Sequence, residues 1–96
     1  MKVKLFVSPI KTKKYRAIFY DKNNNILNQT DFGADGYEDY TIHKDDDRKQ
    51  NYLNRHKKRE NWNNPFSAGA LSRWVLWNKP TLKSSWEDYK KRFKLN

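Results

Sequence analysis

Hydrophobic and polar residues alternate along the first third of the chain, in three short runs. In residues 2–7, valine and leucine alternate with lysine, and a period of two is typical of a strand with one buried face. Pro9 ends this run, because proline has no N–H to donate to a strand ladder. Residues 15–20 form a second run, rich in aromatic side chains, and residues 26–30 form a third.

The segment that joins the second and third runs has the composition of a hairpin turn. Residues 21–25 contain only Asp, Lys and Asn, and Asn and Asp tolerate the positive φ angles of tight turns. Strands this close in sequence pair antiparallel without a crossover. The pattern therefore predicts a three-stranded antiparallel meander over residues 2–32. Two glycines then interrupt it, and we expect residues 33–44 to be a loop, either bare or with a short strand at residues 40–42.

Helical patterns begin after this loop. Residues 45–47 are three aspartates, which suit a helix start because a carboxylate can cap the first amides and the other acids lie at the positive end of the helix dipole. The first helix is expected to run from about residue 46 to Glu60. Its apolar stripe is thin, with only Tyr52, Leu53 and His56, so this helix should be the most solvated one.

Two more helices are predicted nearer the C-terminus. Ser67 suits the N-cap of a helix over residues 68–77, whose apolar side chains cover most of its circumference and predict a buried central position. Pro80 ends it, and Thr81 caps the third helix. The apolar stripe of that third helix follows helical spacing, at Leu82, Trp86, Tyr89 and Phe93.

These elements predict an α+β fold: an N-terminal three-stranded antiparallel meander packed against about three C-terminal α-helices. A chain of 96 residues fits one domain. We expect a single domain over residues 1–96, with the meander in residues 1–32, the loop in residues 33–44 and the helical part in residues 45–96.

Composition excludes several classes of protein. The chain has no cysteine, which excludes disulfides, thiolate zinc sites and cysteine nucleophiles. Its N-terminal residues are too charged for a signal peptide, and no apolar run approaches the roughly 18 residues of a membrane helix. We therefore expect a protein that is not secreted and has no membrane partner.

Charge is distributed unevenly along a chain whose net charge is +10. Residues 1–22 carry seven bases and one acid, residues 23–47 carry one base and seven acids, and residues 48–96 carry thirteen bases and three acids. An excess of this kind attracts polyanions. The acidic segment, residues 31–47, can either mask the basic helices or face away from the partner, and the sequence leaves both open.

The strongest basic cluster lies on the first predicted helix. Arg48, Arg55 and Arg59 would form one row on a helix surface, and guanidinium groups suit bidentate phosphate contacts. The alternative is an ordinary solvated face of a lysine-rich protein. We predict phosphate contacts from ten residues: Arg48, Lys49, Arg55, Lys57, Lys58, Arg59, Arg73, Lys90, Lys91 and Arg92.

Two other groups of residues invite functional interpretations with simpler alternatives. The aromatic residues of the second strand, Tyr15, Phe19 and Tyr20, lie among lysines and could stack on bases, but aromatics of a small sheet are more often core. His43 beside Asp45–Asp47 suggests a metal-dependent nuclease, but helix capping explains the same residues. We expect no metal, no cofactor and no enzymatic activity.

The second half of the chain resembles a known group of proteins. The segments at residues 36–44, 55–62, 68–74 and 76–81 resemble a family of small uncharacterised proteins of large double-stranded DNA viruses of algae and amoebae. The resemblance spans roughly residues 32–93. It implies a viral source and a place in the virion or in the cytoplasm or nucleus of the infected host cell. That family has no assigned activity, so the resemblance supplies no catalytic residue.

The sequence thus favours a basic viral protein that binds DNA or RNA through phosphates without strong sequence specificity. The alternative is a minor capsid or other structural protein that binds viral protein surfaces. A small metal-dependent nuclease is the third hypothesis.

Overall fold

The three hydrophobic runs form one antiparallel sheet in the computed structural model, which describes all 96 residues. The strands are β1 (Lys2–Val7), β2 (Lys13–Tyr20) and β3 (Ile26–Ala34), in the order β1-β2-β3. The predicted meander is confirmed, and it extends two residues further than expected. Val3 lies opposite Phe19, and Tyr15 opposite Phe32, so alternate residues of each strand share one face.

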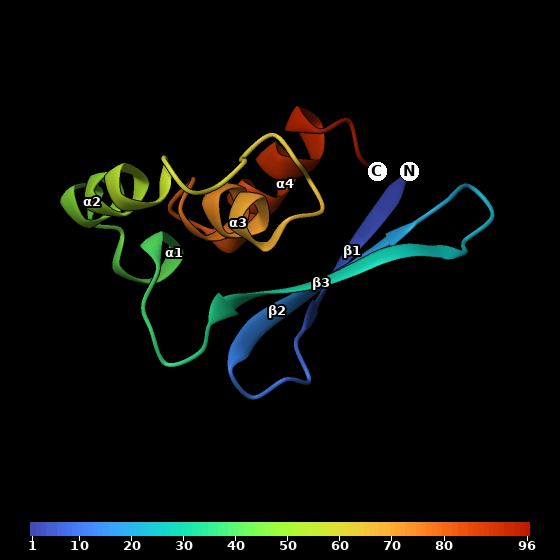
Figure 1. The fold of residues 1–96 in the computed structure, drawn as a ribbon, viewed down its shortest axis with the longest axis horizontal. Helices are drawn as coiled ribbons and strands as arrows, with labels where there is room; N and C mark the ends of the chain where they lie inside the picture. The colour runs from blue at the N-terminus through green and yellow to red at the C-terminus, as the bar shows by residue number, and fades with distance from the viewer.

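The helical part follows the sheet in four short pieces. They are α1 (Tyr40–His43), α2 (Asp46–His56), α3 with its continuation η1 (Ala68–Leu71 and Ser72–Leu76), and α4 (Leu82–Arg92). The α+β class is therefore confirmed, with a short fourth helix, α1, added to the three predicted. All the helices lie on one side of the sheet (Figure 1).

The segment between the sheet and the first long helix differs from the prediction. Residues 40–42 form a helical turn, α1, and the short strand considered there is wrong. The Asp39 carboxylate explains the turn, because it accepts a hydrogen bond from the Thr41 N–H at 2.9 Å and so caps the first amides. Lys44 then ends α1 in the left-handed conformation, at φ 54°.

All three predicted N-caps are confirmed. Asp45 Oδ1 accepts from the N–H groups of Asp47 and Arg48 at the start of α2. Ser67 Oγ accepts from the Ala70 N–H at the start of α3, and Thr81 Oγ1 accepts from the Ser84 N–H at the start of α4. The α2 helix ends at His56 instead of Glu60, so Arg59 lies in the turn that follows it.

The central helix changes its pitch half-way. From Ser72 it continues as a π-helix, in which the Trp77 N–H donates to the Ser72 carbonyl at 3.1 Å. A π-turn holds more residues than an α-turn, so side chains three positions apart diverge around the axis. Trp74 and Trp77 consequently have different neighbours: Trp74 lies against Arg73 and Arg92, whereas Trp77 stacks on Tyr52.

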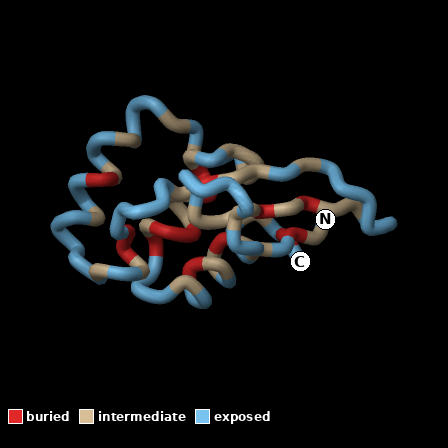
Figure 2. Tube along the Cα trace, turned by 90° about the horizontal axis from the view of Figure 1, so that it is seen from below, coloured by how far each residue is buried: buried red, intermediate tan, exposed pale blue.

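The core lies between the inner face of the sheet and the central helix (Figure 2). Ala17, Phe19 and Phe32 from the sheet are fully buried, as is Tyr89 of α4. The remaining core residues come from β1, the central helix and the C-terminus: Val3, Leu71, Val75, Leu76 and Leu95.

Both chain ends lie side by side at one edge of the sheet (Figure 1). The Val3 N–H donates to the Asn96 carbonyl at 3.0 Å, and the Asn96 N–H donates to the Met1 carbonyl at 3.1 Å. These bonds pair the C-terminus with the outer edge of β1 and hold α4 over the sheet. The sheet's other face carries no helix (Figure 1).

Candidate nucleic-acid interface

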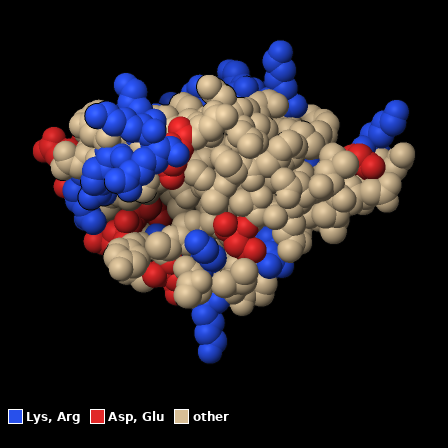
Figure 3. Space-filling view, in the orientation of Figure 1, with Lys and Arg blue, Asp and Glu red and all other residues tan.

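The α2 helix projects from the body of the molecule and presents its cations to solvent. Tyr52 is its one buried residue, and its ring stacks on the Trp77 indole with 4.2 Å between ring centroids and 3° between planes. The rest of the helix is exposed or partly exposed. Arg48, Arg55 and the three cations after them are exposed, and Lys and Arg side chains gather over α2 in Figure 3.

Two acids of the central segment are paired with cations of the sheet. Arg16 holds Asp31 through two hydrogen bonds, at 2.9 and 3.1 Å, and these bonds lower the pKa of the Asp31 carboxyl against the opposing effect of its burial. Lys14 donates to Asp39 at 2.6 Å. Asp31 and Asp39 are the two least exposed acids of the central segment, and both are bound to cations of β2.

Only one α2 cation is paired with a central acid. Arg48 lies 3.4 Å from Glu38, and both side chains are about half exposed, at 48% and 57%. An ion pair this open and this long contributes little. No ion pair holds Arg55, Lys57, Lys58 or Arg59. The acidic segment does not neutralise the basic surface of α2.

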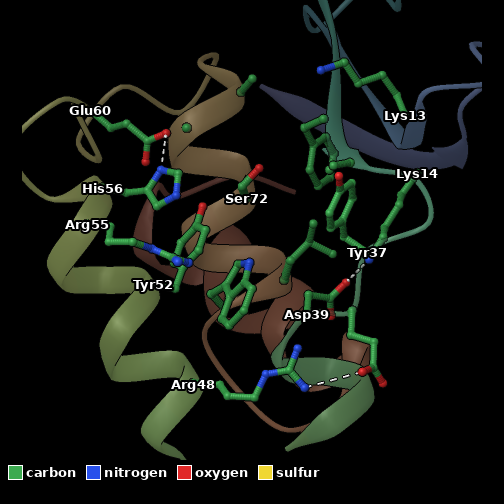
Figure 4. Close-up of a pocket in the computed structure, with 18 of the residues that line it drawn as sticks. Lys13, Lys14, Tyr37, Asp39, Arg48, Tyr52, Arg55, His56, Glu60 and Ser72 are labelled. Carbon is green, nitrogen blue, oxygen red and sulfur yellow. Dashed lines mark hydrogen bonds and ion pairs between the residues drawn. The ribbon is translucent and has the colours of Figure 1, made fainter. Parts of the chain in front are cut away.

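A cleft of about 600 Å³ separates α2 from the end of β3 and the loop after it. Its walls are α2 on one side and the chain around Lys13, Lys14 and Tyr37 on the other, with the central helix between them (Figure 4). Arg48 and Arg55 line it together with Tyr52. Part of the predicted arginine row therefore faces this cleft.

Aromatic rings form one wall of the cleft. The Tyr52 ring lies between His56, at 4.2 Å, and Trp77, also at 4.2 Å. Burial raises the pKa of Tyr52 well above its usual range, and the Glu60 carboxylate adds to this effect. Tyr37, on the opposite wall, is 73% exposed.

The three acids of the cleft each have a cationic or hydrogen-bonding partner. Asp39 is paired with Lys14 and Glu38 with Arg48. Glu60 accepts from the Trp62 indole at 3.1 Å and lies 3.3 Å from His56 Nδ1. Lys13 and Arg55 have no such partner, so the unpaired charge of the cleft is positive.

A family model described as a family of unknown function, DUF5754, matches residues 3–56. The chain belongs to this family. No curated protein and no solved structure matches the chain. The DUF5754 segment covers the sheet, α1 and α2, whereas the sequence resemblance described above was placed on residues 32–93. The two ranges share residues 32–56, and no comparison links this chain to a virus.

The DUF5754 segment contributes most of the cleft. Both unpaired cations, Lys13 and Arg55, lie within it, as do Tyr37 and Tyr52. The central helix, which follows the segment, adds Trp77 and others. Because the family has no assigned function, the chemistry of the cleft follows from its geometry alone.

Two of the predicted phosphate contacts have structural partners instead. Lys49 donates to the Asn78 carbonyl at 2.7 Å and lies 4.7 Å from the centroid of the Tyr40 ring. Its burial, with nearby Arg73, lowers its pKa. Arg73 is half-buried, donates to the Trp77 carbonyl at 2.8 Å and lies 4.1 Å from the centroid of the Trp74 ring.

The predicted contacts on α4 lie away from α2. The central helix separates the two helices in Figure 1. Arg92 lies 3.7 Å from the centroid of the Trp74 ring and 3.5 Å from Asp88. Lys91 is exposed and Lys90 is half-buried. These cations form a second basic area and do not continue the α2 surface.

The aromatic residues of β2 do not form a stacking platform. Phe19 is fully buried, and Tyr15 packs at the edge of the core against Phe32. Tyr20 lies on the uncovered face, where the Lys4 ammonium is 5.7 Å from its ring centroid. Because side chains alternate along a strand, Tyr15 and Phe19 lie on the inner face of the sheet and Tyr20 lies on the outer face.

His43 and two of the three aspartates support local structure. His43 Nδ1 accepts from the Asp45 N–H at 2.9 Å, Asp45 caps α2, and Asp46 accepts from the Tyr40 hydroxyl at 2.6 Å. They belong to no group of acids and histidines placed to hold a metal ion.

No helix has the length and apolar character needed to span a bilayer.

Sequence reasoning missed the opposite wall of the cleft. Lys13 lies in the lysine-rich segment at residues 11–14, and Tyr37 lies in the glycine-containing loop. Neither residue was among the predicted contacts. An exposed aromatic beside Gly36 was the available signal. Nothing in the spacing shows that this loop lies opposite α2.

Proposed function

We propose that this protein binds nucleic acid through the phosphate backbone, without strong sequence specificity, and that it does so as a binding protein with no catalytic step. One observation carries the proposal: the exposed cations Arg55, Lys57, Lys58 and Arg59 are free of ion pairs. Cations of this kind release counterions from a polyanion, which supplies affinity without reading sequence.

The placement of these cations suits a phosphate backbone. Arg48 and Arg55 are seven residues apart on α2, which corresponds to roughly 10 Å along the axis. Successive phosphates along one strand of a duplex are about 3.4 Å apart along its axis, so the helix can reach several of them. With Lys57, Lys58 and Arg59, about five phosphates come within reach of this surface.

A binding titration tests the proposal. Fluorescently labelled duplex DNA, single-stranded RNA and polyglutamate are titrated with the protein at two salt concentrations. We expect both nucleic acids to bind more tightly than polyglutamate and to lose affinity at the higher salt. Equal affinity for polyglutamate, or affinity for nucleic acid that does not change with salt, would contradict the proposal.

A matched pair of variants locates the surface. Lys57→Gln with Lys58→Gln removes two charges beside α2. Lys22→Gln with Lys83→Gln removes two exposed charges from the β2–β3 turn and the start of α4, both outside the α2 surface. The first pair is expected to weaken binding several-fold more than the second. Equal losses would show that binding depends only on net charge.

The uncovered face of the sheet favours a second candidate, a minor capsid or other structural protein. Phe6 and Ile26 are 43% and 60% exposed and lie on the face that also presents Lys2 and Lys4. This combination of apolar and cationic groups is complementary to an acidic protein surface with apolar residues at its centre. In a virus, the capsid protein would be that partner.

Virion fractionation separates the two candidates. If the source is a large DNA virus, a capsid component is recovered in constant proportion with shells emptied of DNA. A nucleic-acid binder is lost with the genome. The viral source and the place in the virion or infected cell belong to these proposals and are tested by the same fractionation.

A further inference from the structure

We propose that the cleft between α2 and the β3 end holds one unpaired nucleotide, so that the nucleic acid bound by this protein is single-stranded at that point. This inference rests on the proposed function and names its substrate class. It accounts for the position of Arg48 and Arg55, which line the cleft as well as belonging to the basic surface of α2.

Aromatic rings line both walls of the cleft, and the Tyr37 ring is the one whose faces are free, because both faces of Tyr52 are covered by His56 and Trp77. Tyr52, His56 and Trp77 form a stacked column on one side, and Tyr37 stands on the other (Figure 4). No aromatic contact is made by the Tyr37 ring, although it is 73% exposed. An aromatic side chain left free over a cleft is the type of group on which a base stacks.

The size and form of the cleft fit one nucleotide. Its volume of about 600 Å³ lies within the roughly 300–1,000 Å³ of small-ligand sites. A base pair with its two backbones is far too wide to enter. A duplex would therefore have to extrude a nucleotide first, which costs unpairing and unstacking energy.

The unpaired charges of the cleft select an anion. Lys13 projects from one wall and Arg55 from the other, and neither has an acidic partner. Arg48 at the lower end is bound only by the exposed contact with Glu38. The phosphates on either side of a bound base would meet these groups, and Arg55 continues directly to the exposed cations after α2.

Most charged side chains of the cleft are paired with one another and so are not free to read the base edge: Lys14 with Asp39, Arg48 with Glu38 and His56 with Glu60. The uncharged polar groups that line the cleft, apart from the tyrosine hydroxyls and the Trp77 indole N–H, are the side chains of Asn51 and Ser72. Stacking on an aromatic ring tolerates any base. The cleft should therefore prefer single strands without a strong preference for sequence.

Anisotropy titrations with a single-stranded oligonucleotide and with the duplex of the same sequence test the proposal. The single strand is expected to bind at least roughly tenfold more tightly. Tyr37→Leu should remove most of that preference and leave duplex affinity unchanged, whereas Tyr37→Phe should keep it. Phe6→Leu, an aromatic replacement on the far face of the sheet, is the matched control and should change neither affinity.

Equal affinity for single strand and duplex in the wild type would overturn the proposal, as would a Tyr37→Leu variant that weakens both equally. Adenosine 5′-monophosphate, followed by NMR shifts of the cleft residues, separates this inference from the proposed function. Shifts at Tyr37 and Arg55 without polymer binding would support the nucleotide cleft and contradict the nucleic-acid function. Polymer binding with no preference for single strands and no NMR shifts would support the nucleic-acid function and contradict the nucleotide cleft.

Discussion

The Lys14 ammonium donates to Asp39 Oδ2 at 2.6 Å, and this ion pair joins β2 to the start of α1. The two side chains are 13% and 4% exposed. The pair has two consequences: it anchors the loop that forms one wall of the cleft, and it occupies a central acid that would otherwise be available to α2.

Removing the Asp39 carboxylate should therefore destabilise the fold. Asp39→Ala removes both the cap on Thr41 and the partner of the half-buried Lys14, and we expect a loss of about 2–4 kcal/mol. Urea unfolding measures it. Glu38→Ala, which breaks only the exposed contact with Arg48, should cost less than about 1 kcal/mol. Similar losses in the two variants would refute the structural role of the buried pair.

Gly33 and Gly36 provide a second matched comparison. Both have positive φ, 81° and 85°, so alanine costs about 1–2 kcal/mol in either backbone. A Cβ at Gly33 would also lie 2.8 Å from Leu76 Cδ1, whereas nothing lies within 4 Å at Gly36. Gly33→Ala should thus lower thermal stability clearly more than Gly36→Ala. Equal melting temperatures would show that the central helix does not pack this closely on β3.

The elements of the fold follow from local signals in the sequence. Alternation at residues 2–7 and the Asp-Asn turn at residues 21–25 predict the meander, and side-chain caps at Asp45, Ser67 and Thr81 predict where helices begin. The end of α2 and the π-turn at Ser72 were not predictable in this way. Near its end, α2 packs through Tyr52 on Trp77, just after the central helix, and the local sequence carries no signal of this contact.

The candidate site was predicted only in part. Charge density identified Arg55 and the cations after it, which are exposed as expected. The same criterion also selected Lys49 and Arg73. Both side chains bind carbonyl groups and pack on aromatic rings, and the local sequence does not show these contacts. Tyr37 was missed because it becomes a candidate binding residue only by lying across the cleft from α2. The two segments are about fifteen residues apart, and their spacing in the sequence does not show that they face each other.

High pH should unfold the protein through its buried tyrosines. Burial raises the pKa of Tyr89, and burial with the Glu60 charge raises that of Tyr52. Tyrosines in an unfolded chain lose their protons near pH 10, so above that pH the folded state retains protons that the unfolded state releases. Their contribution is complete below about pH 10 and is lost as pH rises beyond it.

Urea unfolding at a series of alkaline pH values measures this effect. Tyr89→Phe should start less stable at neutral pH, because it loses the hydrogen bond to the Pro65 carbonyl at 2.7 Å, but its stability should fall less steeply above pH 10. A variant slope as steep as that of the wild type would contradict the assignment.

The dependence of duplex DNA affinity on salt tests the central claim most directly. With about five phosphates engaged, the logarithm of affinity should fall with the logarithm of salt concentration at a slope near −4 to −5. Replacing Arg55, Lys57, Lys58 and Arg59 by glutamine should reduce that slope to about −1, since each lost phosphate contact removes about one unit. A flat response in the wild type, or an unchanged slope in the variant, would contradict the account.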